Sequence, residues 1–147
     1  VARMVSRADL IHSVDSLRLL HAIDASAGQA GKQQKILLEV NVSGESSKHG
    51  FTSAELSNVL EEAASLPGVF VSGLMCMAGL RGSIDDARRE FELLRQLRDS
   101  NQTANCDNIA LTELSMGMSG DFEAAIEQGA TIVRIGSILF ENNDRSA

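Results

Sequence analysis

The sequence predicts an α/β fold built on parallel strands, either a doubly wound sheet or part of a TIM-type (β/α) barrel. Short apolar runs rich in strand-forming residues alternate with helical patterns in the order βαβαβαβαβ. The connections between these elements are short, and no repeat or low-complexity segment interrupts them. Because such regular alternation places helices over a parallel sheet, both architectures satisfy it.

The first strand is predicted at residues 10–14, and a helical pattern with one apolar face begins at Leu17. Asp15 or Ser13 is expected to cap this helix. After a glycine-containing polar stretch, residues 36–42 form a β-branched run that is typical of a buried strand.

The second helix has a distinct start signal. Thr52 and Glu55 form a capping box, and Pro67 together with the following glycine ends the helix. A third strand is predicted at residues 69–75. Ser83 is then expected to cap a helix whose charged side chains mostly face water.

The remaining elements are a strand at residues 109–115, a short helix at residues 120–128 and a strand at residues 131–136. In parallel α/β folds, ligands bind at the carboxyl ends of the strands. We therefore expect functional residues directly after each apolar run.

Composition excludes several classes of function. The 147 residues carry a net charge of -7 and only 3% aromatic side chains, so neither a basic surface nor a stacking platform for nucleic acid is expected. No apolar run approaches the ~20 residues that span a bilayer. Cys76 and Cys106 make no disulfide framework, and no Cys/His cluster has zinc-ligand spacing. These features predict a soluble, cytoplasmic protein without a metal site.

Residues 115–121 join a strand end to a helix start. Their small side chains let the backbone approach a ligand, and free amides at the helix start can hold an anion. The segment is a candidate phosphate cradle. Equally, Ser119 can simply cap the helix while Asp121 complements its dipole.

Arg134 lies within an apolar strand, where an unpaired guanidinium is costly, so it needs an acceptor partner. The alternative to a ligand is a structural ion pair with an acidic side chain, for which the candidates are Glu39, Glu113 and Asp121. Gly136 and Ser137 follow it and can offer amides and a hydroxyl to phosphate. The Arg-x-Gly-Ser pattern alone does not decide between these readings.

Together these segments resemble the YggS/PROSC family of pyridoxal phosphate (PLP) homeostasis proteins. The similarity is collinear over almost the whole chain and rests on residues 10–16, 40–50, 73–75, 114–123 and 133–137. The Ser-Met-Gly-Met-Ser-x-Asp pattern at residues 115–121 is its most specific part. Lys48 belongs to the second of these segments.

The resemblance implies a barrel like the N-terminal domain of alanine racemase, with these strands as the last five of eight. It also implies that PLP lies at the carboxyl mouth of the barrel. The implied contacts are Ser115, Gly136 and Ser137 to the phosphate, Arg134 to the pyridine nitrogen, and Asn41 and Met75 around the ring. An arginine at that nitrogen disfavours its protonation and weakens the ring as an electron sink, which suits a carrier.

Two features of the family have no counterpart here. The lysine that binds PLP covalently lies on the family's first strand, and the third strand carries a Phe-Ile-Gly-His-Leu-Gln-type segment. The chain also does not begin with Met. We therefore expect residues 1–147 to be the C-terminal part of a single barrel domain, with PLP bound non-covalently at most. Two unpaired sheet edges are expected to favour aggregation, dimerisation or an incomplete barrel.

The expected function is a non-catalytic carrier that buffers PLP in vitamin B6 homeostasis and delivers it to PLP-dependent apoenzymes. An amino-acid racemase is the first alternative, but it needs a catalytic tyrosine from a second domain, and this chain contains none. A barrel enzyme that binds sugar phosphates is the second alternative, supported only by the glycine-rich strand ends.

Overall fold

A computed structural model describes residues 1–45, 49–79, 82–102 and 106–140 of the chain. Its elements in chain order are α1 (Ala2–Val5), β1 (Leu10–Val14), α2 (Leu17–Gln29), β2 (Gln34–Glu39), α3 (Leu56–Ala64), β3 (Val69–Met75), α4 (Ile84–Ser100), β4 (Ile109–Met118), α5 (Phe122–Glu127), β5 (Ile132–Arg134) and the short 3₁₀ helix η1 (Ser137–Leu139). The predicted alternation of strands and helices is confirmed.

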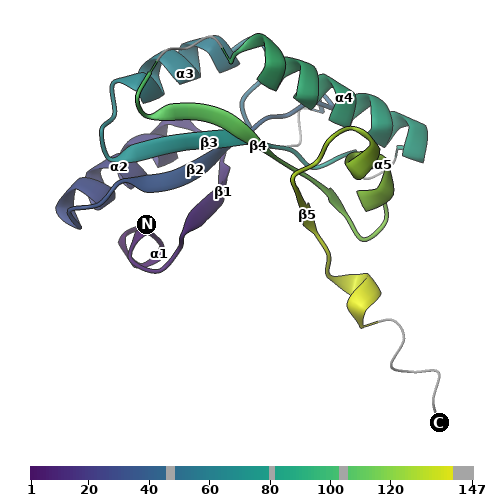
Figure 1. Ribbon diagram of the computed structural model, residues 1–147, viewed down its shortest axis with the longest axis horizontal. Coiled ribbons are helices and arrows are strands. Elements are labelled where there is room, and N and C mark those ends of the chain that lie inside the picture. The colour runs from purple at the N-terminus through teal and green to yellow at the C-terminus, as the bar shows by residue number, and fades with distance from the viewer. Residues whose placement is uncertain (46–48, 80–81, 103–105, 141–147) are drawn as a thin grey trace.

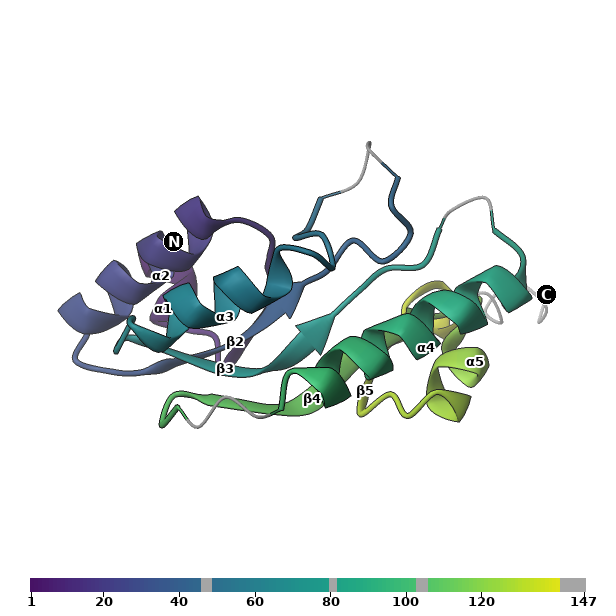
Figure 2. The same ribbon diagram turned by 90° about the horizontal axis from the view of Figure 1, so that it is seen from above.

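The five strands form one parallel sheet in the order β1-β2-β3-β4-β5, so each strand pairs with its neighbour in sequence. The sheet is curved, and α3 and α4 lie along its outer side (Figure 1). Figure 2 shows α2 and α3 packed beside each other over one end of the sheet and α4 over the other. This arrangement is half of a barrel, as the resemblance implied.

The core lies between the outer face of the sheet and the helices. Ile36 and Leu38 of β2 belong to it together with Leu20 and Ile23 of α2, and all four are fully buried. Each such side chain contributes about 1.5–3 kcal/mol by leaving water. Because successive strand residues alternate in direction, Leu37 belongs to the concave face.

The predicted cap at Ser83 and the predicted capping box of Thr52 and Glu55 are both present as reciprocal hydrogen bonds. The Ser83 hydroxyl accepts from the Asp86 amide at 3.2 Å, and the Asp86 carboxylate accepts from the Ser83 amide at 2.8 Å. Thr52 and Glu55 make the same reciprocal pair at 3.3 and 2.8 Å. In this second case α3 begins only at Leu56, so the box closes the turn that leads into the helix.

Two other predicted caps are wrong. Ser16 caps α2, in place of Asp15 or Ser13, because its side chain accepts the amide of the first helical turn. The cap residue of α5 is Asp121 and not Ser119. The Ser119 hydroxyl points instead to the chain that follows β5.

Strands β3 and β4 approach each other closely at Gly73. This glycine pairs with Glu113, and a Cβ built on it would lie 2.0 Å from the Glu113 carbonyl oxygen. The same Cβ would lie 2.8 Å from the Glu113 amide nitrogen. No side chain therefore fits at position 73 while the two strands keep this spacing.

Candidate functional site

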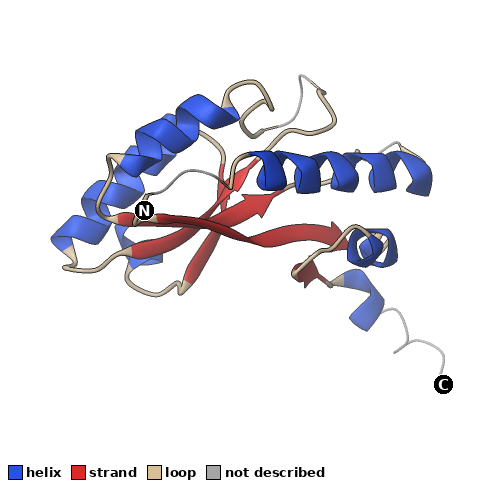
Figure 3. Cartoon of the chain, turned by 45° about the horizontal axis from the view of Figure 1, so that its top comes forward, coloured by secondary structure: helices blue, strands red, loops and turns tan. Residues whose placement is uncertain are grey.

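The carboxyl end of the sheet gathers polar side chains from several strands. His12 lies on β1, Glu39 ends β2, Ser115 lies on β4 and Arg134 ends β5. Figure 3 shows the strands, in red, gathered into one twisted sheet with helices, in blue, around it. Because all pairings are parallel, the carboxyl ends of the strands meet at one edge.

Arg134 is held by acceptors from two other strands. One guanidinium nitrogen donates to the Ser115 hydroxyl at 2.8 Å, and another donates to the Cys76 carbonyl, directly after β3, at 2.9 Å. In the part of the chain that the structure describes, Arg134 makes no ion pair with an acidic side chain. The structural ion pair that sequence reasoning left open is therefore not found there.

Two of the acidic residues proposed for that pair are engaged by neighbours instead. The Glu113 carboxylate accepts from the Thr131 hydroxyl at 2.6 Å, and the Asp121 carboxylate accepts from the Met118 amide at 2.6 Å. Arg134 thus donates to two neutral acceptors, and among the described residues no carboxylate pairs with it.

His12 joins the same network. Its Nδ1 lies 3.0 Å from the Ser115 hydroxyl, which also receives the Arg134 bond. The pKa of His12 is lowered from its ordinary range, first by burial and then by the nearby charge of Arg134. At neutral pH this histidine is therefore uncharged.

Glu39 is a buried carboxyl group at this edge, with 6% of its surface exposed. Its pKa is raised, chiefly by burial and then by Asp15, while His49 and Arg134 oppose the shift. The charged form of Glu39 is consequently less stable here than it is in the unfolded chain.

Replacing Glu39 by glutamine is expected to raise the free energy of unfolding at pH 8. A raised pKa in the folded state means that the ionised carboxylate destabilises the fold above that pKa. The increase in free energy of unfolding over the wild-type chain should shrink as the pH falls through the raised pKa of Glu39. It should vanish below the ordinary glutamate pKa of about 4.3. Urea unfolding of both proteins at several pH values measures it. This account would be contradicted if the difference in free energy of unfolding between Glu39→Gln and the wild-type chain were the same at pH 8 and pH 4. It would also be contradicted if the control Glu61→Gln, at an exposed residue, showed the same pH dependence.

A second cluster lies where the chain leaves β4 and β5. The Ser119 hydroxyl accepts from the amides of Gly136 at 3.1 Å and Ile138 at 3.4 Å. Two backbone amides thus converge on one oxygen atom, at a point where Gly136 and Ser137 are exposed. Converging amides are the donors that proteins use to hold oxygen-bearing anions.

Gly117 shapes the turn that carries Ser119. Its φ is +90°, and a Cβ on it would lie 2.6 Å from the Ala125 Cβ of α5. Both facts require glycine, because other residues rarely adopt this backbone conformation and no space exists for a side chain. Gly117 therefore lets the end of β4 lie directly against α5.

Asn41 and Met75 lie at the same edge. Met75 ends β3 and is 2% exposed. The Asn41 amide group shapes its own loop: it donates to the Glu45 carbonyl at 2.9 Å and accepts from the Gly44 amide at 3.1 Å. Lys48 lies outside the described residues.

Ser115 contacts Arg134, whereas the Gly136 amide donates to Ser119. The phosphate role of Ser115 stays a prediction, and its hydroxyl lies on the Arg134 side of the edge. His12 stands near the end of the first predicted strand, where functional residues were expected, and Ser119 belongs to the candidate phosphate cradle at residues 115–121. Neither residue was given a specific role, because histidine spacing carried no information and Ser119 could equally be a helix cap.

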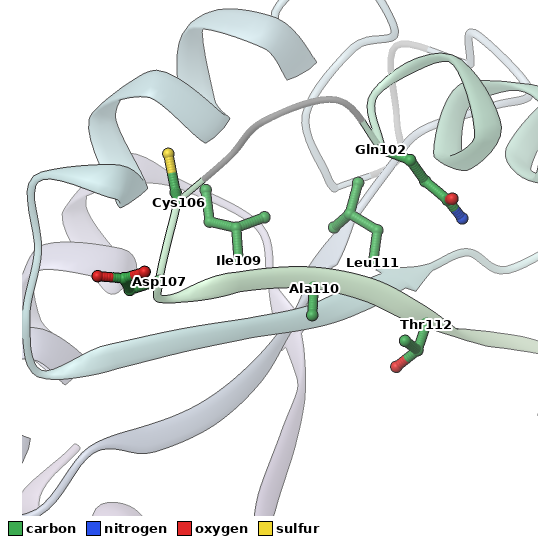
Figure 4. A pocket seen from close by; sticks show the side chains of 7 residues that line it. All are labelled: Gln102, Cys106, Asp107, Ile109, Ala110, Leu111 and Thr112. Atoms are coloured by element: carbon green, nitrogen blue, oxygen red, sulfur yellow. The ribbon is translucent and has the colours of Figure 1, made fainter.

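A hollow elsewhere on the chain is not part of this edge. It has a volume of about 460 Å³. Figure 4 shows side chains that line it, among them Cys106, Asp107 and the first residues of β4. It adjoins Ile109, whereas Ser115 and Met118 lie toward the other end of the same strand. Parallel α/β folds bind ligands at the carboxyl ends of their strands, so the polar edge remains the candidate site.

Among the described residues, no three His, Cys, Asp or Glu side chains are grouped so as to hold a metal ion. Within those same ranges, no helix combines the length and apolar character that crossing a bilayer requires.

Comparison with known proteins identifies relatives along nearly the whole chain. The family described as "Alanine racemase, N-terminal domain" matches residues 1–144. A pyridoxal phosphate homeostasis protein of Aquifex aeolicus is 44% identical over 140 residues, which cover 95% of this chain and 60% of that protein. The human protein of the same name is 34% identical over 145 residues, covering 93% of this chain and 51% of that one. The chain thus spans less than two thirds of these relatives.

Solved structures agree with this likeness. PipY of Synechococcus elongatus PCC7942 without PLP superposes with a TM-score of 0.87 at 35% identity, covering 95% of this chain and 64% of PipY. The structure of PipY with PLP bound gives 0.83 at 34% identity, with the same coverage. An alanine racemase of Clostridium difficile shares the fold at a TM-score of 0.75 and 15% identity, covering 95% of this chain and 36% of the racemase.

Proposed function

The chain belongs to the alanine racemase N-terminal domain family, and from this premise we propose that it binds PLP non-covalently and serves PLP homeostasis as a carrier. The observation that carries the proposal is the pairing of two clusters at one sheet edge. Arg134 with its acceptors forms one cluster, and the amides that converge on the Ser119 hydroxyl form the other. A fixed cation and an anion-binding backbone suit a ligand with a heteroaromatic ring and a phosphate.

The residues present fit such a ligand. Gly136 and Ser137, which are exposed and adjoin the converging amides, would hold the phosphate together with Ser119. We place Ser115, assigned to the phosphate by resemblance, on the ring side, because its buried hydroxyl contacts Arg134. Asn41 and Met75 would line the surroundings of the ring.

Arg134 sets the electronic character of this site. An arginine stays protonated and can only donate, so a ring nitrogen that faces it acts as an acceptor and remains unprotonated. Bound PLP would supply electron withdrawal from an attached group, and this withdrawal is weak when the ring nitrogen is unprotonated. The arrangement therefore favours storage and transfer of the cofactor over carbanion chemistry.

We further propose that the chain acts without catalysis, as part of a single barrel domain that hands PLP to PLP-dependent apoenzymes in the cytoplasm. Its relatives are named as homeostasis proteins. Both cysteines are free thiols, which fits a reducing compartment. An alanine racemisation assay on the same preparation separates this role from the racemase alternative, which predicts turnover.

Replacing Arg134 by glutamine is expected to weaken PLP binding about tenfold, because a hydrogen bond from a charged donor is lost. Isothermal titration of PLP into the chain measures the affinity. Pyridoxal, which lacks the phosphate, should bind at least about tenfold more weakly than PLP. The matched control is Arg89→Gln on α4, an exposed arginine paired with Asp86, which should leave the affinity unchanged.

Two results would overturn the proposed function. One is a wild-type chain that shows no heat of binding with millimolar PLP. The other is equal affinity for PLP and pyridoxal, because a site without phosphate recognition cannot be the one described. Displacement of PLP by a sugar phosphate at equal concentration would favour the sugar-phosphate alternative.

A further inference from the structure

His12 and Ser115 meet across the concave face of the sheet. His12 lies on β1 and Ser115 on β4, and β2 and β3 separate these strands in the sheet. Their side chains are nevertheless 3.0 Å apart. Because this contact exists only through the curvature of the sheet (Figure 1), it is a tertiary contact between strands that are not neighbours.

The partners of Ser115 limit the directions that its hydrogen bonds can take. Arginine has donors only, so the Ser115 oxygen accepts the 2.8 Å bond from Arg134. A hydroxyl has one proton and two lone pairs, so the 3.0 Å contact with His12 fits either donation from Ser115 to Nδ1 or donation from a protonated Nδ1 to Ser115. In the first arrangement the imidazole is neutral and carries its proton on Nε2.

We propose that His12 is a positioning residue for Arg134. By taking the Ser115 proton, His12 turns a lone pair of the Ser115 oxygen toward the guanidinium, which the Cys76 carbonyl holds from its other side. Arg134 is thereby fixed in one orientation before any ligand arrives. The benefit to PLP binding rests on the proposed function, whereas the fixed orientation is a property of the chain alone.

At neutral pH, His12 is in the uncharged form that the proposed hydrogen bond from Ser115 requires. Burial and the charge of Arg134 both lower the pKa of His12. Among the described residues, the charges that act on the Glu39 carboxyl at the same edge are those of Asp15, His49 and Arg134. Protonation of His12 in acid would turn Nδ1 into a donor, so Ser115 would lose its acceptor and a second cation would face Arg134.

The first test uses nitrogen-15 NMR of the ligand-free chain. We expect His12 to show a protonated Nε2 and an unprotonated Nδ1 at pH 7, and Arg134 to show slow rotation of its guanidinium. His12→Phe, which keeps a ring but removes the acceptor, should free that rotation. His12→Asn, which can offer an oxygen near the Nδ1 position, should restore it. His21→Phe on α2 is the matched control outside the site.

The second test measures PLP affinity in the same variants. We expect His12→Phe to weaken binding about tenfold and His12→Asn to recover most of the loss. A proton on Nδ1, or unchanged Arg134 rotation in His12→Phe, overturns the positioning role whether or not PLP binds. Failure of the wild-type chain to bind PLP overturns the proposed function instead, and leaves the NMR result to decide the role of His12.

Discussion

Replacing Gly73 by alanine is expected to lower the free energy of unfolding by about 4 kcal/mol or more. The added Cβ would lie 2.0 Å from the Glu113 carbonyl oxygen, which is backbone and cannot rotate away. Strands β3 and β4 must then separate at the centre of the sheet, and the hydrogen bonds of their pairing weaken. Urea unfolding followed by circular dichroism measures the loss.

The matched control for Gly73 is Gly28 in α2, where a Cβ would meet nothing within 4 Å. Gly28→Ala is expected to be neutral or stabilising by up to about 1 kcal/mol, because alanine favours helix. If Gly73→Ala unfolds at the same urea concentration as the wild-type chain, the close approach of β3 and β4 does not exist in solution.

Replacing Gly117 by alanine is expected to cost about 3 kcal/mol of stability and to weaken PLP binding about tenfold. The stability loss has two sources, a φ of +90° and a contact of 2.6 Å with the Ala125 Cβ. The affinity loss follows because Gly117 shapes the turn that aims Ser119 at the Gly136 amide. Urea unfolding and calorimetric titration of PLP measure the two effects separately.

Gly120 provides the control for this second substitution. It lies just after β4, in the connection to α5, but a Cβ on it would meet nothing within 4 Å, and its φ is not positive. Gly120→Ala should therefore leave both stability and affinity nearly unchanged. An equal loss of affinity in the two variants would show that the turn matters through its flexibility and not through its shape.

The strands could be predicted from sequence because apolar periodicity and β-branched runs reflect burial on a sheet. Residues 10–14 and 69–75 were predicted with the bounds of β1 and β3. The ends of β4 and β5 were not, because pairing with a neighbour decides where a strand stops. The four-residue α1 was missed, since so short a helix leaves no periodic pattern.

Only those features of the site that depend on neighbouring residues in the sequence could be predicted. Arg134 stood out because a lone cation in an apolar strand demands a partner, and the prediction that it needs acceptors is confirmed. The link from His12 to Ser115 spans 103 positions and depends on the curvature of the sheet, which no local pattern encodes. Ser119 looked like a helix cap, yet its hydroxyl accepts from an amide 17 positions away.

The order of the strands also governs how this chain can assemble over time. Because each strand pairs with the one that precedes it, the paired residues lie only about 16 to 40 positions apart along the chain, and each loop closes at a small entropic cost. Folding can therefore extend by one strand and helix at a time, with the three-residue β5 added at an edge. A ligand that contacts both β4 and β5 would tie down this last unit, so it should slow amide hydrogen exchange most strongly at Ile132–Arg134.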